Sequence, residues 1–197
     1  MGVSYKSFNA AVQKVRRELD AMGIPTEDVA GVDVWLVDGL FGRLGELITK
    51  GLLVAADPRT NGYCYEGGIW ILSTRLPAGP LVDVIRHEYG HAVADRHPAV
   101  FSSRKFRCAF GAEYEDGLSC AERQGDASCV SVYARTNVQE DFAETFMLYL
   151  KHGGVLPRRF AGNKDIARKW EAVAWCVDGL NARRRKVPSK RRVAIAE

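Results

Sequence analysis

Apolar residues recur along the first part of the chain at spacings that distinguish a helix from strands. Over residues 4–22 they lie three and four positions apart with charged residues between them, which predicts an amphipathic helix. Residues 32–37 (VDVWLV) alternate and are rich in β-branched side chains, and residues 69–73 (IWILS) form a continuous apolar run, so both segments predict strands. Between them the pattern predicts a short helix and a further strand, over residues 40–50 and 52–56.

Helical spacing dominates the second half of the chain. A helix is expected to begin at Pro80, where the missing N–H costs nothing, and to run to about Arg96. Helical spacing returns over residues 137–151 and around 165–180. The intervening residues 99–131 are rich in Gly, Ser, Asp and Cys without a sustained period, so they predict a long irregular loop. Helices and a few strands in this order predict an α+β fold.

Composition and charge divide the chain into a domain and a tail. The 197 residues are 47% hydrophobic and 26% charged, and no apolar run approaches the ~20 residues that a membrane helix needs. The net charge is +4, but residues 181–197 carry seven Lys or Arg and one Glu, a net charge of +6 that leaves −2 for residues 1–180. We expect one domain over residues 1–180 and a basic, disordered tail over 181–197, with a weak nucleic-acid contact of the tail as the alternative.

The N-terminus and the cysteines bear on the compartment. The first 20 residues interleave Lys and Arg with single apolar residues, unlike a secretory signal peptide, so we expect a cytoplasmic protein or one delivered by a non-classical route. The five cysteines are widely spaced and form no CxxC pair, which favours free thiols in a reducing compartment. A bridge within the group of Cys108, Cys120 and Cys129 is the alternative, because these three fall in one loop-rich stretch.

The helix expected after Pro80 contains an HExxH motif. His87 and His91 are four residues apart, so both imidazoles leave the same face of the helix and can share one tetrahedral zinc ion. Glu88 lies about 100° round the helix, where it can reach a water on the metal without binding the metal itself. The opposite face is apolar, with Val82, Ile85, Tyr89 and Val93. The alternative is an ordinary helix that carries this short pattern by chance.

Two glutamates on the later helix are candidate partners of that motif. Glu140 and Glu144 lie one turn apart on the same side, so one can bind metal while the other supports the site. The opposite side is apolar, with Phe142, Phe146 and Tyr149. Each glutamate has an alternative role: Glu140 can form a capping box with Asn137, and Glu144 can be a solvated helix charge.

His97 competes with Glu140 as the third metal ligand. It lies ten residues after His87, the spacing found in metzincins, where a glycine ends the helix and lets the chain turn back. That position is Ala94 in this chain, a good helix former, so the helix is expected to continue and carry His97 away from the metal. Met147 falls inside the Glu140 helix and cannot form a methionine turn. We therefore predict Glu140 as the ligand.

Two segments give the chain a resemblance to a known family. Residues 131–137 (SVYARTN) and 140–146 (EDFAETF) resemble the second motif of gluzincin metallopeptidases related to the catalytic domain of anthrax lethal factor. Uncharacterised bacterial zinc-binding metallopeptidases share this motif and a Phe-Gly pair similar to Phe110-Gly111. The resemblance extends over about residues 65–150, less than half of the chain.

The resemblance implies a zincin-like fold, with a small mixed sheet packed on the HExxH helix and a second ligand-bearing helix. It also implies that Glu140 is the third zinc ligand, that Tyr133 donates a hydrogen bond to the oxyanion, and that Glu144 supports the site.

The expected function is hydrolysis of a peptide or protein substrate by a zinc-activated water, with Glu88 as the general base. A toxin or effector would fit this activity. Two alternatives stay open: a cytosolic zinc protease recruited to nucleic acid by its basic tail, and a metal-binding or peptide-binding module without turnover. The presence of Glu88 argues against the last, because a protein without turnover needs no base there.

Overall fold

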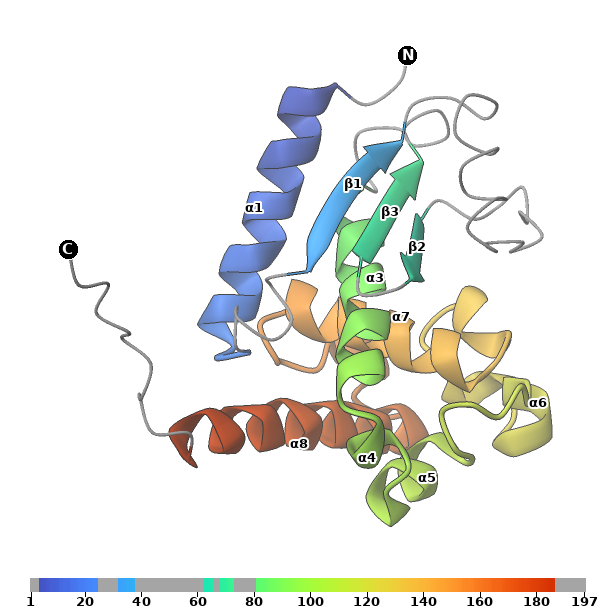
Figure 1. Cartoon of the computed structure of the whole chain (residues 1–197). Coiled ribbons are helices and arrows are strands. Elements are labelled where there is room, and N and C mark those ends of the chain that lie inside the picture. Colours follow the sequence, from blue (N-terminus) through green and yellow to red (C-terminus); the bar gives the residue numbers. More distant parts are fainter. Residues whose placement is uncertain (1–3, 25–31, 38–61, 66–67, 73–80, 187–197) are drawn as a thin grey trace.

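The structure is a computed structural model of the chain (Figure 1). It describes residues 4–24, 32–37, 62–65, 68–72 and 81–186. The helix predicted over residues 40–50 and the strand predicted over residues 52–56 lie outside these ranges. Among the described helices, none combines the length and the apolar character needed to cross a membrane.

The first helix, α1, is amphipathic as the spacing predicted. It spans Tyr5–Ala21 and begins after Ser4, whose hydroxyl accepts a hydrogen bond from the backbone N–H of Ser7 at 3.2 Å. Its apolar face is buried in the core through Phe8, Val12, Val15 and Leu19. The helix predicted over residues 4–22 is therefore confirmed.

A small mixed sheet lies beside α1 (Figure 1). It consists of β1 (Asp33–Val37), β2 (Gly62–Tyr65) and β3 (Gly68–Leu72), in the order β1-β3-β2. The central strand β3 runs parallel to β1 and antiparallel to β2. The strands predicted at residues 32–37 and 69–73 are confirmed over their described residues. Several helices around one small mixed sheet fit the predicted α+β class.

Two helices, α3 (Leu81–Arg96) and α7 (Val138–Lys151), pack against each other in the middle of the domain. They approach closely at Gly90, where an added Cβ would lie 3.0 Å from the Cα of Ala143. α3 also contacts β2 and β3. Both predicted helices are confirmed, and α3 continues through Ala94 as expected. This close packing brings the predicted metal ligands of the two helices together.

The last helix is longer than predicted. α8 spans Lys164–Lys186 and contacts α7, whereas the spacing predicted an end near Leu180. Six residues that the charge pattern assigned to the tail are therefore helical. Gly179 weakens the helix near the expected end, but Arg and Lys, which follow it, are good helix formers, and no proline occurs between Lys164 and Pro188.

The irregular loop predicted over residues 99–131 is wrong, because this stretch contains several short helices. They are α4 (Pro98–Phe101), α5 (Arg104–Phe110), α6 (Cys120–Arg123) and the 3₁₀ turn η2 (Asp126–Ser128). Further 3₁₀ turns are η3 (Tyr133–Arg135) and η4 (Arg158–Phe160). Helices of one or two turns show no sustained period. They are held instead by serine caps, such as Ser119 with Glu122, and by aromatic packing of Phe101 and Phe106.

Cys120 and Cys129 form a disulfide, so the expectation of free thiols is wrong for this pair. Their Cα atoms lie 6.8 Å apart, because the chain turns back between α6 and η2. Cys108 is an exposed free thiol and Cys176 a buried one. The cysteines therefore no longer favour a reducing compartment.

Candidate metal centre

Three side chains from α3 and α7 converge on one point. His87 and His91 lie on successive turns of α3, with their Nε2 atoms 3.1 Å apart. Oε2 of Glu140, from the first turn of α7, lies 3.0 Å from Nε2 of His87 and 3.5 Å from Nε2 of His91. The close approach at Gly90, the residue before His91, makes this convergence possible.

The spacing of these three atoms suits a metal ion. Ligands at about 2.0–2.2 Å from zinc in tetrahedral geometry lie roughly 3.3 Å from one another, close to the 3.0, 3.1 and 3.5 Å found between the donors. Glu140 Oε2 is buried and accepts no well-aligned hydrogen bond from a described residue. The donors therefore point to a shared position more than to one another, and the set fits zinc.

The second nitrogen of each imidazole is held by another residue. Nδ1 of His87 lies 2.9 Å from Oε1 of Glu144, and because a carboxylate only accepts, Nδ1 carries the proton and Nε2 presents its lone pair. Nδ1 of His91 lies 2.9 Å from the hydroxyl of Tyr114. The other oxygen of Glu144 accepts a hydrogen bond from Ser131 at 2.6 Å. Such outer partners are typical of metal-binding histidines.

The electrostatics of the centre favour a cation. Burial opposes a charge on His87, but its close contacts with the carboxylates of Glu140 and Glu144 and the nearby Glu88 outweigh this effect and raise the pKa of His87 to about 10. Burial alone would raise the pKa of Glu140, but its contacts with His87 and His91 lower it to about 2. In the metal-free protein, the second proton on His87 therefore supplies the positive charge that balances the nearby carboxylates. A bound metal ion can replace that proton.

Glu88 is buried beside the donors, with 5% of its surface exposed. Burial raises the pKa of Glu88, against the opposing influence of His87 and His91. A carboxyl group with a raised pKa next to a metal-binding site is suited to proton transfer near neutral pH.

Tyr133 lies at the open edge of the centre. It is the first residue of η3, its ring centroid is 5.6 Å from that of His87, and 44% of the residue is exposed. Its position beside the ligands is compatible with contact to a bound substrate.

His97 does not join the donors. α3 ends at Arg96, and His97 is the residue that precedes α4. Within the described part of the chain, the imidazole-containing group that could hold a metal is His87, His91 and Glu140. The sequence reasoning missed Tyr114 and Ser131 as partners of the centre. Ser131 belongs to the segment that carries the family resemblance, whereas no local pattern marks Tyr114.

A second group of potential ligands consists of Cys120, Cys129 and Asp141. The two sulfur atoms are already bonded to each other. Asp141 Oδ2 lies 2.7 Å from Lys169 Nζ and 3.1 Å from Arg123, with all three side chains fully buried. The chain thus supplies the cations for this carboxylate, and the group is not a candidate metal site.

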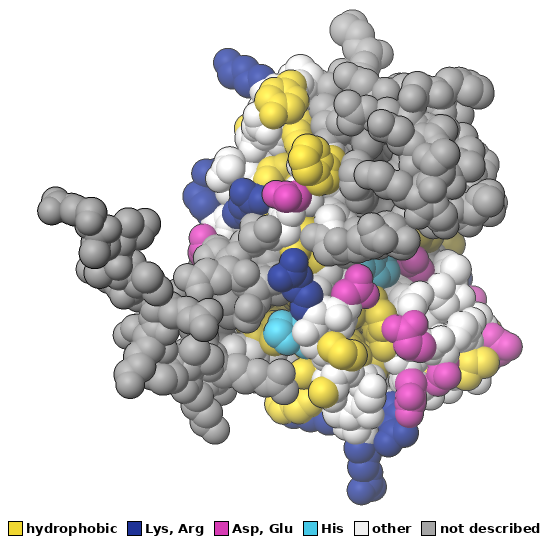
Figure 2. Space-filling view, in the orientation of Figure 1, with side chains coloured by type: hydrophobic (Ala, Val, Ile, Leu, Met, Phe, Trp, Pro, Cys, Tyr) yellow, Lys and Arg dark blue, Asp and Glu magenta, His cyan; other side chains and the backbone are white. Residues whose placement is uncertain are grey.

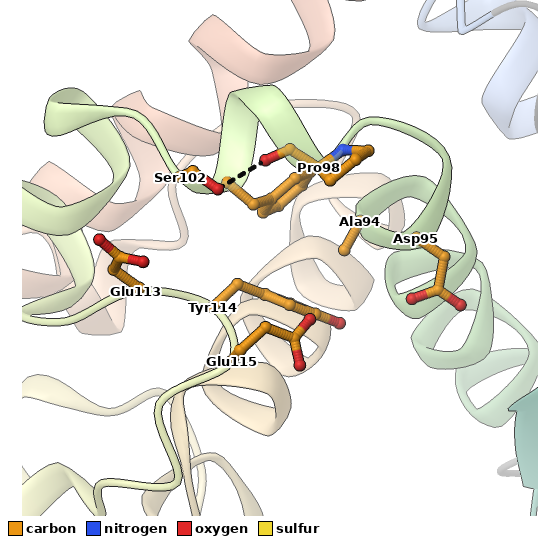
Figure 3. A pocket seen from close by; sticks show the side chains of 8 residues that line it. Ala94, Asp95, Pro98, Ser102, Glu113, Tyr114 and Glu115 are labelled. Atoms are coloured by element: carbon orange, nitrogen blue, oxygen red, sulfur yellow. Dashed lines mark hydrogen bonds between the residues drawn. The ribbon is translucent and has the colours of Figure 1, made fainter.

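A pocket of about 340 Å³ adjoins the centre at the C-terminal end of α3 (Figure 3). Tyr114 belongs to both, since its ring lines the pocket and its hydroxyl contacts His91. The carboxyl groups of Asp95, Glu113 and Glu115 also line the pocket. Figure 2 shows acidic side chains on this face towards the side where Figure 1 places α6, and Lys and Arg side chains at its lower end.

Comparisons with protein-family models, with curated proteins and with solved structures find no match for this chain. The resemblance to gluzincins therefore rests on the motif residues alone. What the chain does has to be argued from the geometry of the centre.

Proposed function

We propose that this chain is a zinc-dependent metallopeptidase of gluzincin type with a zincin-like fold. Its zinc would be held by His87, His91 and Glu140. The observation that carries the proposal is the convergence of two imidazole nitrogens and one carboxylate oxygen within 3.5 Å of one another, next to the buried carboxyl group of Glu88. Three protein ligands of this kind are typical of catalytic zinc sites, which keep one position for water or substrate.

Each residue of the centre has a defined task in peptide hydrolysis. A bound zinc ion would supply Lewis acidity, which polarises a peptide carbonyl and lets water lose a proton near neutral pH. Glu88 accepts that proton and passes it to the departing amine. The Tyr133 hydroxyl donates a hydrogen bond to the carbonyl oxygen as its negative charge develops. Glu144 holds the imidazole of His87 in the tautomer that presents Nε2, and Tyr114 orients the imidazole of His91.

The fold around the centre supports the same proposal. α3 carries the HExxH residues and rests on β2 and β3, while α7 brings Glu140 and Glu144 to the same place. Ligands on two packed helices are held rigidly, which favours a fixed metal geometry. The pocket lined by Tyr114, whose hydroxyl contacts His91, offers a recess for part of an extended substrate.

Cleavage profiling of a peptide library by the zinc-loaded protein tests the proposal. Glu88→Gln should keep its zinc and lose about 10²- to 10⁴-fold in rate, because the amide fits the site and cannot accept a proton. Glu171→Gln, a glutamate on the exposed side of α8, is the matched control and should cleave like the wild type. Equal rates for Glu88→Gln and wild type would exclude Glu88 as the base. A zinc-loaded wild type that cleaves no peptide would be a metal-binding protein without turnover.

A further inference from the structure

The segment between α6 and α7 reaches the metal centre through the hydroxyl of Ser131. Its Oγ donates to Oε2 of Glu144 at 2.6 Å and accepts from the backbone N–H of Ala134 at 3.0 Å. The other oxygen of Glu144 holds Nδ1 of His87 at 2.9 Å. Ser131 therefore fixes the carboxylate that orients a metal ligand, and it acts as a positioning residue.

One side of this segment is exposed and the other packs on α7 and α6. It contains two single 3₁₀ turns, and Val132 and Tyr133 are 77% and 44% exposed. Its buried side belongs to a small cluster built around Cys120 and Cys129, which Val130 connects to the main core. The disulfide between these cysteines ties the segment to α6 only two residues before Ser131. Because this covalent link restricts the chain so close to Ser131, it adds to the packing on α7 in placing that residue.

A buried ammonium group lies beside the two sulfur atoms. Nζ of Lys169 is 4.0 Å from Sγ of Cys120 and 3.8 Å from Sγ of Cys129. Burial lowers the pKa of Lys169, and the Asp141 carboxylate at 2.7 Å opposes this shift; Asp141 also pairs with Arg123, so the three groups together keep a net positive charge. A positive charge next to sulfur stabilises a thiolate, which is the species that opening of the bond releases. A positively charged environment therefore favours reduction of the disulfide more than an apolar environment would.

We propose that the oxidation state of Cys120 and Cys129 sets the metal affinity of the centre by holding or releasing Ser131. The inference rests on the metal centre proposed above. A small dithiol supplies two electrons and closes into its own disulfide. The S–S bond breaks to give one thiol and one thiolate beside Lys169, and the remaining proton goes to water. Ser131 then exchanges its bond with Glu144 for bonds to water, and the His87 imidazole is less firmly oriented.

Zinc affinities of the oxidised and reduced wild-type protein test this inference. Zinc is titrated against a chromogenic chelator, after reduction with dithiothreitol and removal of the reductant under inert gas. We expect a loss of about 10- to 100-fold on reduction, the range for loss of an outer partner of a metal ligand, and recovery on reoxidation. Cys108→Ala is the matched control, because it removes an exposed thiol outside the bridge and should leave the redox response unchanged.

Variants of Ser131 distinguish this route from a general loss of structure. Ser131→Ala should bind zinc weakly in both states, so that reduction changes little further. Ser131→Thr keeps the hydroxyl and should keep the redox response. Three results would each overturn the inference. The first is an equal zinc affinity of the oxidised and the reduced wild type, and the second is a redox response that persists in Ser131→Ala. The third is loss of the helical circular dichroism signal on reduction. Zinc binding by His87→Ala as tight as that of the wild type would instead show that the metal centre itself is wrong.

Discussion

Two neighbouring carboxylates on α7 face opposite kinds of surroundings. Asp141 points to Lys169 and Arg123, two cations that belong to the chain, with distances of 2.7 and 3.1 Å. Glu140 points to two imidazoles, His87 and His91, whose Nε2 atoms lie 3.0 and 3.5 Å from its oxygen. About 100° of helical rotation between consecutive residues sends them to these two sides.

The difference shows how a structural carboxylate can be told from a ligand. A buried charge is costly unless it is paired, and Asp141 has its compensation built into the fold. Glu140 faces two imidazoles, and the charge that balances it is the proton on His87 or a metal ion that replaces it. We therefore expect changes near Asp141 to affect stability and changes near Glu140 to affect zinc.

The largest effect is expected for Glu140→Ala, which removes one of three ligands. Structural zinc sites with four ligands bind with about 10–16 kcal/mol, or roughly 2.5–4 kcal/mol per ligand, so the affinity should fall about 100- to 1,000-fold. His97→Ala, the competing ligand, should bind zinc like the wild type. Chelator competition measures both. The opposite pattern would replace Glu140 with His97 and leave Glu140 as the residue that Asn137 caps.

A somewhat smaller effect, on stability, is expected for Lys169→Met. It leaves Asp141 with Arg123 alone in the core and should lower the free energy of unfolding by about 3 kcal/mol. Zinc stoichiometry should stay unchanged. Lys164→Met, at the exposed start of α8, is the matched control and should change stability by less than about 0.5 kcal/mol. Urea unfolding gives both values, and an unchanged midpoint for Lys169→Met would mean that Asp141 is not compensated as described.

The proton on His87 gives the third prediction. Its pKa of about 10 lies above the ordinary value of 6.5, so the proton stabilises the metal-free fold below pH 6.5, and this contribution is lost as pH rises through 10. Zinc must displace that proton, so its affinity should increase about tenfold per pH unit between pH 7 and 9. Calorimetry in buffers of different ionisation enthalpy should detect about one released proton. A pH-independent affinity without proton release would contradict the assignment.

The smallest effect is expected for Tyr114→Phe, which removes the hydroxyl that hydrogen-bonds with Nδ1 of His91 and keeps the ring in the pocket. One hydrogen bond contributes about 0.5–1.5 kcal/mol, so zinc affinity should fall roughly three- to tenfold. Tyr5→Phe, on the exposed side of α1, is the control for loss of a phenolic hydroxyl. An affinity equal to that of the wild type would show that His91 needs no outer partner.

Short-range patterns predicted the elements that carry the metal centre. The histidine pair of α3 and the glutamate pair of α7 are each four residues apart, so helical geometry alone places each pair on one face. Ala94 correctly predicted that α3 continues past His91. The same patterns failed over residues 99–131, since helices of about one turn are stabilised by caps and packing more than by periodicity.

The sequence by itself determined which residues share a helix face, and hence the candidate ligands His87, His91 and Glu140. Only the tertiary structure decided which residues orient these ligands, and that Asp141 is paired with Lys169 and Arg123 while Glu140 faces the two imidazoles. His87 and Glu144 are 57 residues apart, His91 and Tyr114 are 23 apart, and Asp141 and Lys169 are 28 apart. Such pairs form only when α7 packs on α3 at Gly90 and α8 packs on α7, which no local spacing encodes.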